Sequence, residues 1–154
     1  MQKPLRKFTA LVMVAAMMTG FQSCKIEGPD QDDVIKYQAT INSQNTIPRT
    51  TSSAQGSAAL EYNKTTRVLT YNITYQGLTP TVGHIHKAQP AWEAGPVVFP
   101  FASVATSPIT GTVTLDNEQE TLLRLGNMYI NLHSKEYPAG EIRGQIKPVL
   151  INEP

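Results

Sequence analysis

The sequence predicts an all-β domain: an antiparallel, Greek-key-like β-sandwich of about seven to eight strands with one short helix near residues 117–125. Three observations lead to this prediction. Apolar residues recur at every second position in several short runs, which is the period of a half-buried strand. Clusters of Gly, Pro, Ser, Thr and Asn separate these runs, as turns do. One segment carries the start and stop signals of a helix instead.

The first 23 residues are not expected to belong to this fold. Three basic residues precede an apolar run over residues 8–18, which is too short to cross a bilayer as a helix. This pattern predicts a secretory signal peptide over residues 1–23. The Ser23-Cys24 pair at its end resembles a bacterial lipobox, which implies that Cys24 carries a lipid; ordinary secretion with a free thiol is the alternative.

Composition and the segments that follow the signal predict where the protein resides. Residues 24–33 are polar and turn-rich, as in a flexible tether, residues 34–148 form the domain, and residues 149–154 form a C-terminal tail. We expect the protein in the bacterial cell envelope, anchored to a membrane through Cys24 and facing the periplasm or the cell surface. Three of the 13 Lys and Arg residues lie in the signal, which leaves 10 against 12 Asp and Glu. This near-neutral balance argues against nucleic acid as a partner.

The first half of the domain reads as three strands. Residues 35–41 alternate apolar and polar side chains, and a Thr- and Ser-rich loop over residues 45–55 follows. Two further alternating runs, residues 58–62 and 69–75, flank a turn at Asn63-Lys64 and predict a hairpin.

The second half begins with the segment that carries the chemistry. Residues 82–86 form a strand with His84 and His86 on one face and Ile85 on the other, because side chains alternate along a strand. Further short strands are predicted at residues 97–99 and 109–115.

The helix is predicted from its ends. Asp116 can cap its N-terminus, Gln119 occupies the capping-box position, and Gly126 ends it. Leu122, Leu123 and Leu125 would give it an apolar side.

The last two strands form a hairpin in this prediction. Residues 127–134 and 141–147 flank a polar turn. This pairing would place Glu141 near His133 and Arg143 near Asn131.

The three histidines of the chain are candidates for a metal site. His84, His86 and His133 all lie on faces turned away from the core, and they converge if the two segments are neighbours. Three imidazoles with an open position suit copper or zinc. The alternative is a set of polar-face residues that hydrogen-bond to neighbouring backbone or carboxylates.

Other candidate residues lie close to the histidines. Glu141 and Arg143, at i and i+2 on one face of their strand, could stand beside the metal ligands, although structural pairing with residues of neighbouring strands is the plainer role. Trp92, in the loop over residues 89–96, is either a contact for a ligand or partner or an anchor for its loop. The sequence carries no nucleophile motif, so we expect no enzymatic activity.

Several motifs together resemble one family. These are Gly83-His84-Ile85-His86, Gly95 to Pro100, the helix from Asp116 to Gly126, Met128 to His133 and Tyr137 to Ile146. In this order they resemble the CHRD domain, the module named for chordin and also found in exported bacterial proteins. The resemblance implies an extracytoplasmic β-domain that acts as a non-catalytic binding module for a protein or matrix partner. A copper- or zinc-binding protein is the alternative.

Overall fold

The computed structural model describes residues 33–149. The predicted signal peptide of residues 1–23, the lipidation site Cys24, the tether up to residue 32 and residues 150–154 of the tail lie outside the described residues. The described part contains nine strands, one 3-10 helix and one α-helix. In chain order these are β1 (Val34–Asn42), η2 (Ser43–Asn45), β2 (Gln55–Asn63), β3 (Val68–Gln76), β4 (Val82–Lys87), β5 (Val97–Pro100), β6 (Ile109–Thr114), α1 (Asn117–Arg124), β7 (Met128–His133), β8 (Ile142–Gln145) and β9 (Lys147–Pro148).

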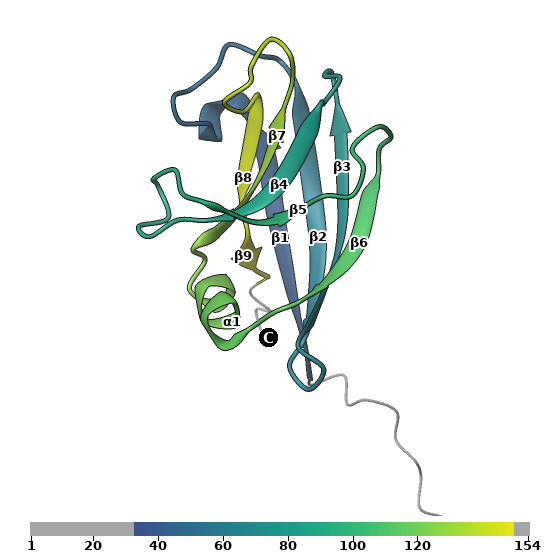
Figure 1. Cartoon of the computed structure of the whole chain (residues 1–154), viewed down its shortest axis with the longest axis vertical. Coiled ribbons are helices and arrows are strands. Elements are labelled where there is room, and N and C mark those ends of the chain that lie inside the picture. Colours follow the sequence, from purple (N-terminus) through teal and green to yellow (C-terminus); the bar gives the residue numbers. More distant parts are fainter. Residues whose placement is uncertain (1–32, 150–154) are drawn as a thin grey trace, which may run out of the picture.

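All strand pairs in the described chain are antiparallel. The strands form one hydrogen-bonded sheet in the order β5-β4-β7-β8-β1-β2-β3-β6, with β9 beside β1. Figure 1 shows β4, β5, β7 and β8 lying across β1 and β2, with α1 at the lower end. This confirms the predicted antiparallel all-β class with one helix, and the two layers are the halves of a single curled sheet.

The two halves meet at a short junction between β8 and β1. Only Asn42 and Arg143 pair there, whereas Gln38 pairs with Lys147 of β9 further along the same strand. The backbones approach so closely at Gly144 that a Cβ atom would lie 2.7 Å from a carbonyl oxygen of β1. The sheet therefore continues at this point from the half that contains β4, β5, β7 and β8 to the half that contains β1, β2, β3 and β6.

The apolar side chains predicted by the period of two fill the space between the halves. Burial of each large side chain contributes about 1.5–3 kcal/mol. The following twelve are the largest fully buried ones among the described residues: Ile41, Leu60, Tyr62, Leu69, Ile73, Ile85, Leu115, Leu123, Met128, Ile130, Leu132 and Ile142.

The helix α1 forms where its capping signals predict. The Asp116 carboxylate accepts from the backbone N–H of Gln119 at 2.8 Å, and the Gln119 side chain accepts from the N–H of Asp116 at 2.9 Å. Gly126 follows with φ +71°. The prediction was wrong for Leu125, which is 64% exposed because it lies at the C-terminal cap, beyond the apolar side of the helix.

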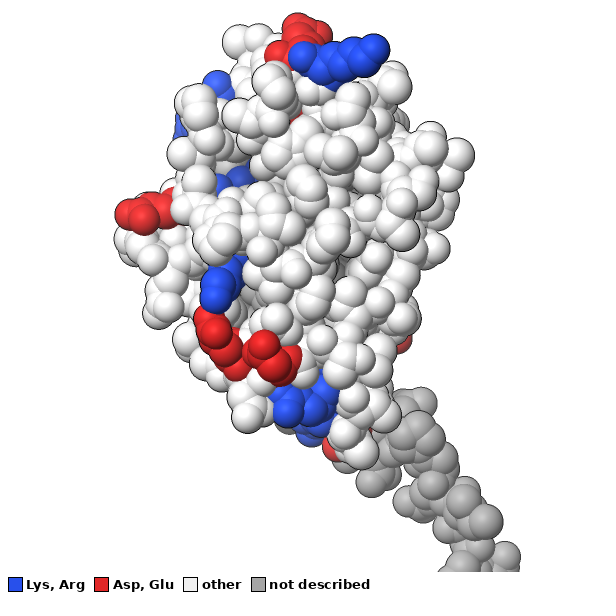
Figure 2. Space-filling model, in the orientation of Figure 1, with Lys and Arg blue, Asp and Glu red and all other residues white. Residues whose placement is uncertain are grey.

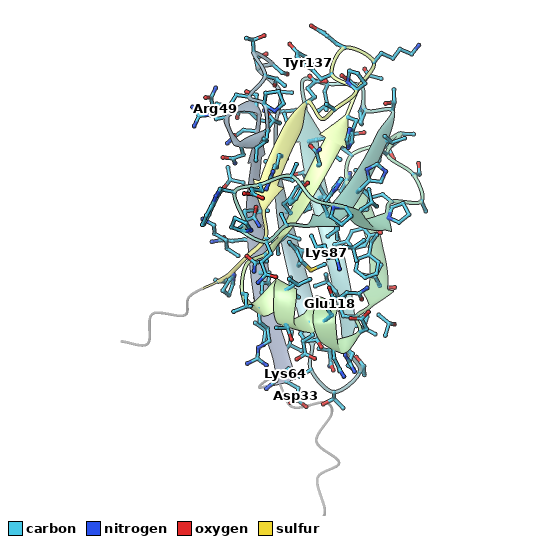
Figure 3. The ribbon with its side chains drawn as sticks, turned by 60° about the vertical axis from the view of Figure 1, so that its left-hand side comes forward. Asp33, Arg49, Lys64, Lys87, Glu118 and Tyr137 are labelled. Atoms are coloured by element: carbon cyan, nitrogen blue, oxygen red, sulfur yellow. The ribbon has the colours of Figure 1, made fainter. Side chains whose placement is uncertain are left out.

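The face of the molecule in Figure 2 carries few charged side chains, and one ion pair links the helix to the sheet. Figure 2 shows small groups of acidic and basic side chains on a largely uncharged surface. Lys87 at the end of β4 pairs with Glu118 of α1 (Figure 3). No helix in the described residues is both long and apolar enough to cross a membrane.

The Asp116 cap offers a test of the helix. Replacement by Ala leaves the Gln119 N–H without its acceptor, so Asp116→Ala should lower the free energy of unfolding by about 1 kcal/mol. Urea denaturation followed by circular dichroism measures this. Asp116→Ser retains a capping oxygen and is the matched control, and equal losses in the two variants would contradict the cap.

Candidate functional site

The three histidines lie on two neighbouring antiparallel strands. His84 and His86 belong to β4 and His133 ends β7, where it pairs with Val82. The imidazole centroids are 5.2 Å apart for His84 and His133, 5.4 Å for His84 and His86, and 6.2 Å for His86 and His133. The structure thus brings the three predicted residues together on the side of the sheet that faces away from the apolar core. We call this group the His cluster.

The ring nitrogens of the His cluster converge more closely than the ring centres do. One nitrogen from each histidine lies within 4.8 Å of the other two. His84 Nδ1 and His133 Nε2 are 3.3 Å apart. Nitrogen ligands at about 2.0–2.1 Å from a tetrahedral zinc ion would be separated by roughly 3.3 Å.

Two backbone carbonyls fix the orientation of the imidazoles. His86 Nδ1 donates to the carbonyl of Gly95 at 2.9 Å, and His133 Nδ1 donates to that of Pro138 at 3.0 Å. Since a carbonyl only accepts, both Nδ1 atoms carry the proton, and in the neutral rings both Nε2 atoms hold a lone pair. Nε2 of His86 is buried and has no hydrogen-bond partner among the described residues. This arrangement is typical of imidazoles that act as metal ligands, because a hydrogen bond at one ring nitrogen fixes the other for the ion.

Burial favours the neutral form of two histidines of the cluster, His84 and His86. It lowers the pKa of His84, and the nearby His133 lowers it further. Burial also lowers the pKa of His86, partly offset by the hydrogen bond to Gly95. Both imidazoles therefore favour the neutral form, which is the form that binds metals.

His86, Tyr129 and Arg143 form a stack of three side chains. Its ring lies parallel to that of Tyr129, with centroids 4.8 Å apart and an interplanar angle of 8°. The guanidinium carbon of Arg143 lies 3.5 Å from the centroid of the Tyr129 ring. Because β7 runs between β4 and β8, the phenol ring separates the positive charge of Arg143 from His86.

The loop between β4 and β5 closes over this stack. Besides accepting from His86, Gly95 donates its N–H to the Tyr129 hydroxyl at 3.1 Å. A Cβ atom at Gly95 would collide with the Lys87 carbonyl. Glycine is therefore required here for the loop to approach β4 closely enough to reach both side chains.

Glu141 and Arg143, predicted to stand beside the ligands, lie in different places. Arg143 pairs with Asn131, as the hairpin register predicts. Glu141 is buried, but its carboxylate accepts from Ser52 at 2.6 Å, and the His cluster does not include it. The backbone N–H of Glu141 donates to the carbonyl of Leu132, beside His133, at 2.8 Å, as the hairpin register predicts. Of the two side chains, only that of Arg143 reaches the surroundings of the histidines, through Tyr129.

Trp92 is 77% exposed in the loop over residues 89–96. An indole this exposed does not anchor the loop in the core. The remaining explanation from the sequence, a contact for a ligand or partner, stays a prediction.

Sequence reasoning missed Tyr129 and the two carbonyls. Strand alternation places Tyr129 on the face turned away from the core, which would be exposed on a half-buried strand, but all six residues of β7 are buried. The carbonyls of Gly95 and Pro138 could not be predicted from residue types, because every residue has a backbone carbonyl. The Gly95-Pro96 and Pro138-Ala139-Gly140 segments were the available hints, because each marks a turn that can fold back on a strand.

Comparison with known proteins gives one family. The family model of the CHRD domain matches residues 37–146, which is more than half of the chain. Comparison with curated proteins gives no match.

The lowered histidine pKa values predict a pH dependence in the metal-free protein. Unfolded histidine has an ordinary pKa of 6.5, so the unfolded state binds protons before the folded state does as the pH falls. The stability that the neutral imidazoles of His84 and His86 contribute is fully present above pH 6.5. It is lost as the pH falls below 6.5 towards the pKa values of the two histidines in the folded state. The free energy of unfolding should therefore decrease between about pH 7.5 and 5.5.

Urea denaturation at several pH values in the presence of a chelator measures this slope. His84→Gln and His86→Asn each remove one imidazole, and each should flatten the slope; the Asn side chain at 86 keeps a donor for Gly95. Identical slopes in the wild type and both variants would show that these imidazoles do not cause it.

Proposed function

Because the chain belongs to the CHRD domain family, we propose that it is a lipid-anchored extracytoplasmic binding module that acts without enzymatic turnover. Family membership supports an extracellular-type binding role. The signal-like residues 1–23 and the Ser23-Cys24 pair support export and anchoring to a membrane of the bacterial envelope, with the domain facing the periplasm or the cell surface.

The arrangement of the domain suits presentation to a partner. Asp33, where the described chain begins, pairs with Lys64 at 3.6 Å and accepts from Thr65. Figure 3 places Asp33 and Lys64 at one end of the domain and Tyr137, in the turn between β7 and β8, at the other. An anchor attached before residue 33 would hold the turn and the neighbouring loops away from the membrane.

The position of Glu141 supports a non-catalytic role. General acid–base chemistry commonly uses an imidazole oriented by a carboxylate. Here the carboxylate of Glu141 bonds to Ser52, and the Nδ1 atoms of His86 and His133 bond to backbone carbonyls. These residues therefore do not form a carboxylate–imidazole pair.

Lipidation is tested by removing the thiol. Cys24→Ala should move the protein from the membrane fraction to the soluble fraction after cell lysis, because the lipid attachment site is lost. Ultracentrifugation and immunoblotting measure the distribution. Cys24→Ala that stays with the membrane would refute the anchor.

The geometry of the His cluster favours a second candidate function, the binding of one copper or zinc ion. The observation that carries it is the convergence of three nitrogens within 4.8 Å, with a buried Nε2 of His86 that lacks a partner. A buried polar atom without a partner is costly, and a metal ion would satisfy it. His84 is the half-buried member, which leaves an open side for a water or another ligand.

The donor set fits such an ion. In the neutral cluster, Nδ1–H of His84 can donate to Nε2 of His133 across their 3.3 Å contact. A tautomer of the half-buried His84 with the proton on Nε2 would free Nδ1 for the ion. Small rotations of the imidazoles would then bring the three nitrogens to ligand distance.

Metal binding is tested on protein purified without a His tag. Dialysis against copper or zinc and then against buffer should leave about one equivalent of metal per chain. The double variant His84→Ala/His86→Ala should retain less than about a tenth of an equivalent, because two of three ligands are lost. Elemental analysis measures the content.

Glu141→Gln is the matched control. The carboxylate of Glu141 bonds to Ser52, so its loss should leave the metal content unchanged. Wild-type protein that retains no more metal than the double variant would exclude this function.

A further inference from the structure

A groove lies at the junction of β1, β8 and β9, apart from the His cluster. Its volume is about 570 Å³, within the range of about 300–1,000 Å³ of small-molecule sites. Gln38 of β1, Lys147 of β9 and Trp92 of the loop after β4 are among the residues that line it. None of the three histidines does. The groove follows from the interrupted pairing between β1 and β8, which leaves the outer side of the junction open.

The groove collects positive charge. Arg49, Arg143 and Lys147 line it, and the described lining residues include no carboxylate. Arg49 and Lys147 are exposed, and Figure 3 shows Arg49 at the edge of the domain. Cations gathered in a concave surface without acidic neighbours focus a positive potential on it. The groove therefore favours an anionic ligand, in contrast to the mixed charges of the face in Figure 2.

The indole of Trp92 stands beside these cations on a fixed loop. Arg143 donates to the carbonyl of Ala91 at 2.8 Å, which holds the loop directly before Trp92. Gly95, after Trp92, is held by His86 and Tyr129. Because the backbone on both sides of Trp92 is held, the loop loses little conformational entropy when a ligand covers the exposed indole.

The remaining lining groups indicate the kind of anion. Gln38 and Gln44 are exposed amides that offer both a donor and an acceptor, which matches neighbouring hydroxyl groups. A flat indole face packs against the C–H face of a pyranose ring, while Arg and Lys bind carboxylates or sulfates. An acidic peptide would use the cations but would leave the amides and the indole less well matched.

We propose that this groove binds an anionic oligosaccharide, with the sugar ring on Trp92 and its acidic groups at the exposed Arg49 and Lys147. The buried Arg143 adds positive charge beneath them. The inference rests on the proposed binding role and names a ligand class for it. It requires neither the lipid anchor nor a bound metal.

Titration of the full chain in detergent and chelator with an oligogalacturonate hexamer tests the proposal. Trp92 is the only tryptophan of the chain, so ligand over the indole should shift its fluorescence emission. Calorimetry should show binding that weakens as salt is added, because the exposed charges are screened. A neutral maltohexaose should bind at least tenfold more weakly, roughly the effect of losing one or two good ionic contacts.

The variants separate the groove from general electrostatics. Trp92→Ala, measured by calorimetry, and Arg49→Gln/Lys147→Gln should each weaken binding roughly tenfold. Lys135→Gln removes a charge from an exposed lysine outside the groove and should leave the affinity unchanged.

Three outcomes would overturn the inference: no heat and no emission shift at millimolar oligogalacturonate, equal affinity for a polyglutamate peptide, or full affinity in Trp92→Ala. The metal content and the membrane fractionation are measured separately. A failure at the groove is thereby distinguished from a failure of the anchor or the His cluster.

Discussion

The structure depends on satisfying the polar face of β7. This strand is buried on both sides: Met128, Ile130 and Leu132 enter the apolar core, and the opposite face carries Tyr129, Asn131 and His133. Buried polar groups need hydrogen-bond partners, since each unsatisfied group costs about 1–3 kcal/mol. The donors on this face bond to carbonyls of the two covering loops: Tyr129 to Gly95, Asn131 Nδ2 to Ala139 and His133 to Pro138. Among the described residues, Oδ1 of Asn131 has no partner. One strand therefore fixes both the loop before β5 and the turn before β8, and the His cluster forms between them.

Arg143 connects the two regions to which we assign function. Its guanidinium lies on the Tyr129 ring, which stacks on His86 of the His cluster. The same guanidinium donates to Ala91, beside Trp92 of the groove. Burial lowers the pKa of Arg143, but arginine remains charged at neutral pH, so its charge is shared by both regions. Any rearrangement of the loop at one region must therefore be accommodated at the other.

Much of the fold and part of the site could be predicted from the sequence, because both depend on side-chain period. The alternation of His84, Ile85 and His86, with a hairpin that aligns Arg143 with Asn131, was enough to place the histidines on one face. The burial of that face could not be predicted, since it comes from backbone carbonyls of loops whose path no periodicity reports. The hairpin register also places the backbone of Glu141 beside His133, but it does not report the tertiary contact that directs the carboxylate to Ser52.

The groove could not be predicted from the sequence, because it arises from how strands distant in the sequence pair. Period and turn signals identify strands but say little about which strands that are distant in sequence will pair. Here β8 meets β1 at a single residue pair, and Gly144 permits an approach that any side chain would block. Where the ladder is broken, outward side chains of β1 and β9 surround an opening instead of a continuous surface. The residues best placed to bind a ligand therefore gather where strand pairing is interrupted, and only the folded chain shows where that is.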